Sequence, residues 1–144
     1  MKINFSISEL CIEDADIPQH VADKLLKYHI IPMQKVRDKL GRAIYCTTSE
    51  GLNSGYRSEN WEFSRGRTGD SQHVFKGKGA IDWRCKRFTE TKHKLLHLII
   101  KHTDYTRIAV YNSFIHCDYK ANNGKRYLYE SNSSNRWKLT RKFI

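Results

Sequence analysis

The sequence predicts a domain of the α+β class. Apolar residues recur at helical spacing in three segments, residues 17–29, 32–40 and 90–102. Short runs rich in β-branched and aromatic residues, bounded by Gly, Asn and Ser, lie between these segments and in the last third of the chain. Since 144 residues fall within the usual size of one domain, we predict that residues 1–144 form a single domain.

The first half of the chain predicts two helices and a strand. Asp16 is the expected N-cap of a helix over residues 17–29. Pro32 opens a second helical segment, which ends at Gly41. Residues 42–48 (RAIYCTT) favour extended structure, so we predict a strand that leads into the next loop.

Residues 49–79 have the composition of a loop. They contain six of the eight glycines together with Ser, Asn and Asp, and no sustained apolar period. A loop of this length in a compact domain is usually functional.

The second half predicts one helix among several strands. Residues 79–85 (GAIDWRC) form a strand that places Asp82 opposite an apolar face. Thr89 is the expected cap of a helix over residues 90–102. The remaining predicted strands are residues 107–111 and 113–119, paired around Asn112, and the shorter segments 126–129 and 136–139.

The net charge indicates an anionic partner. Lys and Arg number 26 against 15 Asp and Glu, a formal net charge of +11. Nucleic acid, an acidic membrane surface and an anionic polymer such as a bacterial cell wall all satisfy this charge. The basic residues are spread along the chain instead of forming one block, which makes a dedicated nucleic-acid-binding arm the weaker interpretation.

Two further features bound the function class. No apolar run approaches the roughly 20 residues that span a bilayer, and the first residues lack the apolar region of a signal peptide. We therefore expect synthesis in the cytoplasm without a signal peptide and no membrane span. The four cysteines are Cys11, Cys46, Cys85 and Cys117. They are widely scattered and form no C-x-x-C pair, which favours free, buried thiols over a cysteine-based zinc knuckle or a disulfide framework.

Three side chains form a candidate metal site. His73 lies in the long loop, while Asp82 and His116 lie on predicted strands. Three protein ligands with a position left for water are typical of catalytic zinc. Asp118 faces the same side as His116, so it either orients that ligand or accepts a proton from the water. Histidines so placed are more often ordinary polar residues, and the residue types alone leave both interpretations open.

A second histidine pair competes with this site. His93 and His97 are four residues apart on a predicted helix, as in the H-E-x-x-H motif, but Lys94 stands where the general-base Glu belongs. We interpret the pair as surface histidines of an amphipathic helix.

The motifs in order give a resemblance to a known family. SGYRSEN, then SQH, a GKGAID segment and a later FIHCD resemble the M15 family of zinc D-Ala-D-Ala carboxypeptidases and L-alanyl-D-glutamate endopeptidases. The likeness extends over about residues 5–119 and includes the opening FSISEL. It implies the hedgehog/DD-peptidase fold, a small antiparallel sheet flanked by helices.

The resemblance also implies roles for individual residues. It makes His73, Asp82 and His116 the ligands of a zinc ion. Arg57 would pair with a substrate carboxylate or steady the oxyanion, since a guanidinium binds a carboxylate through two parallel hydrogen bonds. The residues expected to shape the pocket next to the first histidine are Ser71 and Gln72.

The sequence departs from the family pattern at two points. His73 and Asp82 are nine residues apart, two more than in S-x-H-x-x-G-x-A-x-D, so part of VFKGKG must bulge out. Ser113 occupies the position, three residues before the last histidine, where many members carry a catalytic acid. Some branches that end in H-x-D lack that acid too, and Asp118 matches their aspartate, so we assign the proton-transfer role to Asp118.

These observations predict a zinc peptidase that cleaves the peptide stems of bacterial peptidoglycan. A small enzyme without a signal peptide resembles a phage lysin, which reaches the cell wall through a phage lysis system. One alternative is a catalytically silent relative that keeps zinc and binds wall fragments. Another is a basic nucleic-acid-binding domain, for which the sequence holds no recognised motif. Which peptide bond is cleaved stays open.

Overall fold

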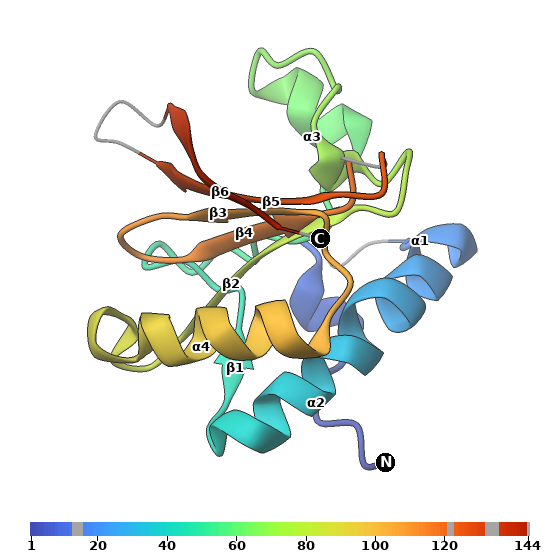
Figure 1. The fold of residues 1–144 in the computed structure, drawn as a ribbon. Helices are drawn as coiled ribbons and strands as arrows, with labels where there is room; N and C mark the ends of the chain where they lie inside the picture. Colours follow the sequence, from blue (N-terminus) through green and yellow to red (C-terminus); the bar gives the residue numbers. More distant parts are fainter. Residues whose placement is uncertain (13–15, 121–122, 132–135, 144) are drawn as a thin grey trace.

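The computed structural model describes residues 1–12, 16–120, 123–131 and 136–143. It confirms the α+β class: a six-stranded sheet in the order β1-β2-β4-β3-β5-β6 lies against helices (Figure 1). The strands are β1 (Ile44–Tyr45), β2 (Ala80–Cys85), β3 (Arg107–Val110), β4 (Ile115–Asp118), β5 (Arg126–Ser131) and β6 (Trp137–Phe143).

The helical elements include two classes besides the α-helix. The α-helices are α1 (Gln19–Lys24), α2 (Ile31–Leu40), α3 (Glu59–Ser64) and α4 (Phe88–His102). Short 3-10 helices are η1 (Ser8–Leu10) and η3 (Gln72–Val74), and a π-helical segment is η2 (Leu25–Ile30). None of the helices in the described part of the chain is both long and apolar enough to cross a bilayer.

The sheet is mixed and not purely antiparallel as predicted. Among the described strands, β3 and β5 pair in parallel and the other four pairings are antiparallel. The cause is that β2 occupies the outer edge of β4. The chain leaving β4 therefore turns back and joins the free edge of β3, where it runs in the same direction as β3.

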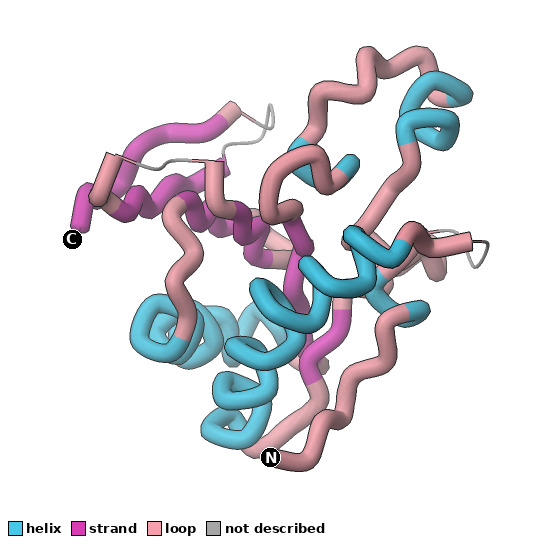
Figure 2. Tube along the Cα trace, turned by 90° about the vertical axis from the view of Figure 1, so that its right-hand side faces the viewer, coloured by secondary structure: helices cyan, strands magenta, loops and turns pink. Residues whose placement is uncertain are grey.

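The two predicted N-terminal helices are one continuous helix from α1 through η2 to α2 (Figure 2). Pro32 lies inside it, although proline has no N–H to donate and crowds the carbonyl four residues earlier. The wider π turn lies immediately before Pro32 and accommodates its ring. The freed carbonyl of Tyr28 accepts a hydrogen bond of 2.7 Å from the Tyr119 hydroxyl.

Several predicted boundaries need correction. Asp16 does not cap the first helix, because α1 begins after Pro18 and no side chain caps it. Gly41 ends α2 in the left-handed conformation, as predicted. The strand predicted over residues 42–48 contains only the two residues of β1. Thr89 lies inside α4, whose N-cap is Arg87.

The predicted loop over residues 49–79 contains structure of its own. It includes α3, which begins after Ser58, and η3, which carries His73. The Ser58 side chain accepts a hydrogen bond from the Trp61 backbone N–H, and Glu59 lies in the first turn, where a carboxylate is favourable. These two signals are in the sequence and predict the helix.

The sheet has two chemically different faces. Ile81, Trp83, Ile108 and Cys117 belong to the buried core cluster, which also contains residues of α2 and α4. Figure 1 shows α2 and α4 on one side of the sheet and α3 on the other. Because strand side chains alternate, the residues between these apolar ones face away from the core. The four cysteines are free and buried, as predicted.

His29 is a buried core histidine with every ring nitrogen engaged. Its Nε2 lies 2.9 Å from the Lys78 carbonyl oxygen, which can only accept, so Nε2 carries the proton. Its Nδ1 lies 2.7 Å from the Tyr105 hydroxyl, which accepts a hydrogen bond from Trp83 and donates to the ring. Burial lowers the pKa of His29 to about 4. The neutral ring therefore connects the N-terminal helix to the loop that follows His73.

We expect this histidine to make stability depend on pH. The unfolded chain takes up a proton near pH 6.5 and the folded chain only near pH 4, so stability is lost as the pH falls through this window. The loss amounts to about 3 kcal/mol. In urea unfolding of metal-free protein at pH 7 and pH 4, His29→Gln should be less stable than wild type at pH 7 and close to it at pH 4. An unchanged difference between the two proteins would contradict this.

Candidate metal centre

The register of the sheet brings together two predicted ligands. Asp82 on β2 and His116 on β4 are direct cross-strand partners, and both project from the face that points away from the core helices. Asp118 lies two residues further along β4 and pairs across the sheet with Arg107 on β3. Strand pairing alone therefore lines up four charged or titratable side chains on one face.

The third ligand comes from the loop. The Ser71 side chain accepts a hydrogen bond from the His73 backbone N–H and starts η3. Phe75 then turns the chain in the left-handed conformation, and Gly79 at φ +92° directs it into β2. A Cβ at Gly79 would lie 2.4 Å from the Phe75 ring, so this position needs glycine.

The two extra residues between His73 and Asp82 are accommodated by this turn and held by the N-terminal helix. The Lys24 ammonium donates to the Phe75 carbonyl at 2.9 Å, and His29 donates to the Lys78 carbonyl. The bulge predicted within VFKGKG is therefore anchored to the scaffold.

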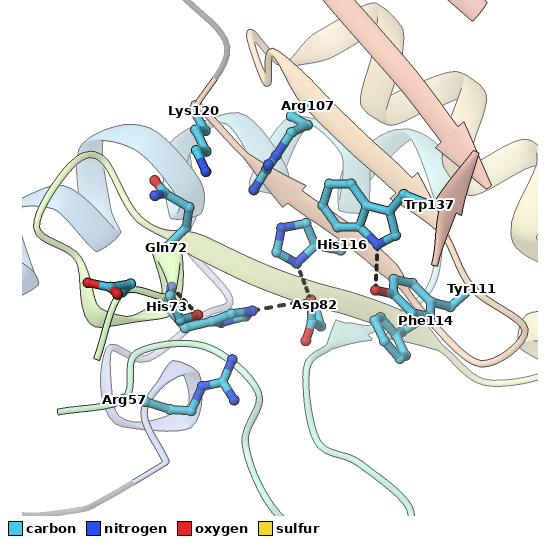
Figure 3. A pocket seen from close by; sticks show the side chains of 12 residues that line it. Arg57, Gln72, His73, Asp82, Arg107, Tyr111, Phe114, His116, Lys120 and Trp137 are labelled. Carbon is cyan, nitrogen blue, oxygen red and sulfur yellow. Dashed lines mark hydrogen bonds and ion pairs between the residues drawn. The ribbon is translucent and has the colours of Figure 1, made fainter. Parts of the chain in front are cut away.

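The three predicted ligands meet. One ligand atom from each of His73, Asp82 and His116 lies within 4.8 Å of the other two, and among the described residues no other group of three such side chains does so. The Asp82 Oδ1 is 2.8 Å from His116 Nδ1 and 3.5 Å from His73 Nε2 (Figure 3). Their side chains are 13%, 10% and 5% exposed, respectively. This arrangement can hold a metal ion.

The hydrogen bonds orient both histidines for this task. His73 Nδ1 lies 2.8 Å from the Gly55 carbonyl oxygen, which can only accept, so Nδ1 carries the proton and Nε2 presents a lone pair to the site. His116 Nε2 lies 2.7 Å from Asp118 Oδ2, which leaves Nδ1 for the site. A carbonyl or carboxylate behind the ligating histidine is the usual outer support of a metal centre.

The carboxylates around His116 favour a proton on its ring. Burial alone would lower the pKa of His116, but the hydrogen bonds that its ring donates to Asp118 and Asp82 raise it to about 9. Burial alone would raise the pKa of Asp82, yet the neighbouring His73 and His116 hold it well below its usual range. A bound metal ion would replace the proton on His116 Nδ1 and satisfy the same carboxylate.

Residues 54–57 support two of the ligands from behind. The Ser54 hydroxyl donates to Asp82 Oδ2 at 2.5 Å, and the Ser54 carbonyl accepts the Asp82 backbone N–H at 2.9 Å. The Gly55 carbonyl holds His73, and the Arg57 backbone N–H donates to the His73 carbonyl. The SGYR segment therefore positions the metal ligands, a role that the motif comparison did not assign to it.

We expect Ser54→Ala to weaken metal binding by about 10-fold to 100-fold, because Asp82 loses the donor that orients its carboxylate. Competition with a chelating dye measures this. Ser113→Ala is the matched control, since Ser113 is exposed and does not line the pocket. Equal zinc affinity in both variants would show that Ser54 has no such role.

Both carboxylate oxygens of Asp118 accept hydrogen bonds from neighbouring groups. Its side chain is completely buried, and it accepts hydrogen bonds from the Arg107 guanidinium, from His116 and from the Lys120 backbone N–H. Burial would raise its pKa, but His116 and Arg107 lower it. Of the two roles considered for Asp118, these contacts favour orienting His116 over taking up a proton.

A pocket of about 370 Å³ opens above the ligands. Its lining includes the predicted ligands and substrate-binding residues: Arg57, Ser71, Gln72, His73, Asp82 and His116. Arg107, Lys120 and Trp137 also line it, and the sequence analysis did not predict them. Arg57 lines the pocket, and its Nε is buried without a hydrogen-bond partner within the described residues. Burial lowers the pKa of Arg57, but a guanidinium stays charged.

The competing histidine pair is confirmed as a surface feature. His93 and His97 are exposed on α4. Neither belongs to a group of three metal-binding side chains in the described part of the chain.

Comparison with known proteins leaves the family open. No family model, no curated protein and no solved structure matches this chain. The motif resemblance and the geometry of the site are therefore the two grounds for assigning a function.

Proposed function

We propose that the chain is a zinc-dependent peptidase that cleaves the peptide stems of bacterial peptidoglycan, with the hedgehog/DD-peptidase fold. The observation that carries the proposal is the convergence of His73, Asp82 and His116 at the base of an open pocket. The motif order SGYRS, SQH, GKGAID and FIHCD supports the choice of family.

The donor set fits zinc. Two imidazole nitrogens and one carboxylate oxygen are common ligands of catalytic zinc, and they leave a position open for water or substrate. Bound there, zinc would polarise the scissile carbonyl and lower the pKa of a water molecule.

The chain's own residues bind and orient the substrate in this proposal. Arg57 lines the pocket, and its guanidinium would bind a substrate carboxylate or a developing oxyanion. Ser71 and Gln72 line the wall next to His73. Asp118 keeps the Nε2 proton of His116 in place, so that Nδ1 stays a ligand.

Neither position considered for the general base supplies a free carboxylate, which supports a second candidate, a catalytically silent zinc protein that binds cell-wall fragments. Ser113 is exposed and lies outside the pocket lining. Asp118 is buried behind His116, where its oxygens are already engaged. Asp70 also lines the pocket, as an exposed carboxylate on η3's N-terminal side.

One experiment separates the two candidates. Metal analysis of purified protein identifies the ion, and mass spectrometry of digested peptidoglycan identifies released peptides and the bond that is cut. Zinc with peptide release supports the peptidase. Zinc with binding of wall fragments and no release supports the silent relative, and a protein that takes up no metal excludes both.

A further inference from the structure

Arg107 is held in a fixed orientation beside the metal ligands. Its Nε and one terminal nitrogen donate to both oxygens of Asp118. The guanidinium lies over the Trp137 ring, 4.6 Å from the ring centre. Its side chain is 21% exposed and lines the pocket, and its other terminal nitrogen, Nη1, makes no hydrogen bond or ion pair within the described residues. An arginine clamped in this way presents its free edge to a ligand at little cost in side-chain entropy.

Lys120 adds a second cation at the same end of the pocket. Its backbone N–H donates to Asp118 Oδ1 at 3.0 Å, so the same carboxylate that orients Arg107 also places Lys120. Figure 3 shows Lys120, Arg107 and Gln72 pointing into one end of the pocket. Two cations and a neutral amide are a suitable donor set for a carboxylate.

Arg57 lies at the other end. In Figure 3 it is on the opposite side of His73 and Asp82 from Arg107 and Lys120. A substrate placed over the metal ligands therefore meets a cation on each side. Among the described residues, two acidic side chains line the pocket, Asp82 and the exposed Asp70. The local charge thus favours anionic groups at both ends.

We propose that Arg107 and Lys120 form a second anion subsite, and that the pocket takes a peptide that carries two carboxylates. One carboxylate meets Arg57 and the other meets the Arg107 and Lys120 end. The inference rests on the proposed function, because it specifies the substrate of the same site. It favours stem peptides with an unblocked acidic residue over peptides in which that carboxylate is amidated.

The test compares two peptides that differ by one functional group. The probes are L-alanyl-γ-D-glutamyl-L-lysine with a free α-carboxylate on its glutamyl residue and the same peptide with an α-carboxamide. Calorimetry gives their affinities for zinc-loaded protein, and mass spectrometry of the same mixtures records cleavage. The variants are Lys120→Gln and Lys120→Glu, which leave the backbone bond to Asp118 intact. Lys101→Gln, an exposed lysine of the last turn of α4, is the control.

We expect wild type and the Lys101 control to bind the free acid about tenfold more tightly than the amide. Lys120→Gln should reduce this preference to about threefold or less, and Lys120→Glu should abolish or reverse it. Equal affinity of wild type for the two peptides, or a preference that survives in both Lys120 variants, overturns the subsite.

The readouts also separate the subsite from the peptidase. Preference without cleavage of either peptide supports the subsite and counts against the peptidase. Cleavage of both peptides with equal kcat/KM and equal affinity supports the peptidase and rejects the subsite. If zinc-loaded protein binds neither peptide, the subsite is wrong, and digestion of whole peptidoglycan decides the peptidase separately.

Discussion

Under the proposed function, His116→Ala should lose both metal binding and turnover of peptidoglycan. The imidazole supplies one of three ligand atoms that lie within 4.8 Å of one another, and the side chain sits between Asp82 and Asp118. Its removal leaves His73 and Asp82 as the remaining ligands. It also removes the ring that hydrogen-bonds both Asp82 and Asp118. We expect zinc affinity to fall by more than about 100-fold, the upper end of the effect of losing an outer support. Metal content after dialysis and peptide release measure the result.

Two further variants make this test specific. His97→Ala removes an exposed histidine of α4 and should keep full metal content. Asp118→Asn should retain the fold but weaken the hydrogen bond to His116 and leave Arg107 without its ionic partner. Zinc retention and full turnover in Asp118→Asn would remove both roles considered for this residue. Retention of zinc by His116→Ala would discard the site.

Gly55→Ala should destabilise the protein by about 3 kcal/mol or more. A Cβ at this position would lie 2.0 Å from the Leu10 carbonyl oxygen and 2.9 Å from the Ile81 side chain. The nearest clash is with backbone, which no change of rotamer relieves, so the penalty exceeds that of ordinary overpacking. The displaced carbonyl would also release His73. Thermal unfolding measures the stability, and dye competition measures the metal affinity.

Gly77→Ala is the matched control for this prediction. A Cβ at Gly77 would have only the Gln72 side-chain oxygen within 4 Å, at 3.8 Å, and its φ is not in the left-handed region. We expect a change of less than about 1 kcal/mol. Similar midpoints of unfolding for the two variants would contradict the close approach described for Gly55.

The metal ligands could be predicted from the sequence because they lie within short motifs. His73 and Asp82 are joined by one glycine-containing turn, and His116 lies in a strand whose alternation is readable. Their meeting depends on β2 pairing with β4, which no local pattern specifies. The motif order supplied that information, and the register confirms the cluster.

Other parts of the site were not predictable in the same way. Arg107 reaches the pocket because β3 pairs with β4 opposite Asp118, and Trp137 because β6 follows a strand that joins β3 in parallel. These are long-range pairings, and in the sequence the two residues look like ordinary strand positions. The π segment before Pro32 was missed for a related reason, since its support comes from Tyr119, far along the chain.

Two different parts of the chain supply the candidate metal ligands and one wall of the pocket. The metal ligands lie on β2, β4 and η3, all formed by residue 118, whereas one wall of the pocket is Trp137 on the edge strand β6. Among the described strands, the terminal hairpin of β5 and β6 hydrogen-bonds to the rest of the sheet through the free edge of β3, and its Trp137 ring packs on His116. Mutations in that hairpin can therefore alter which molecules the cavity accepts during evolution while the metal-binding centre stays the same.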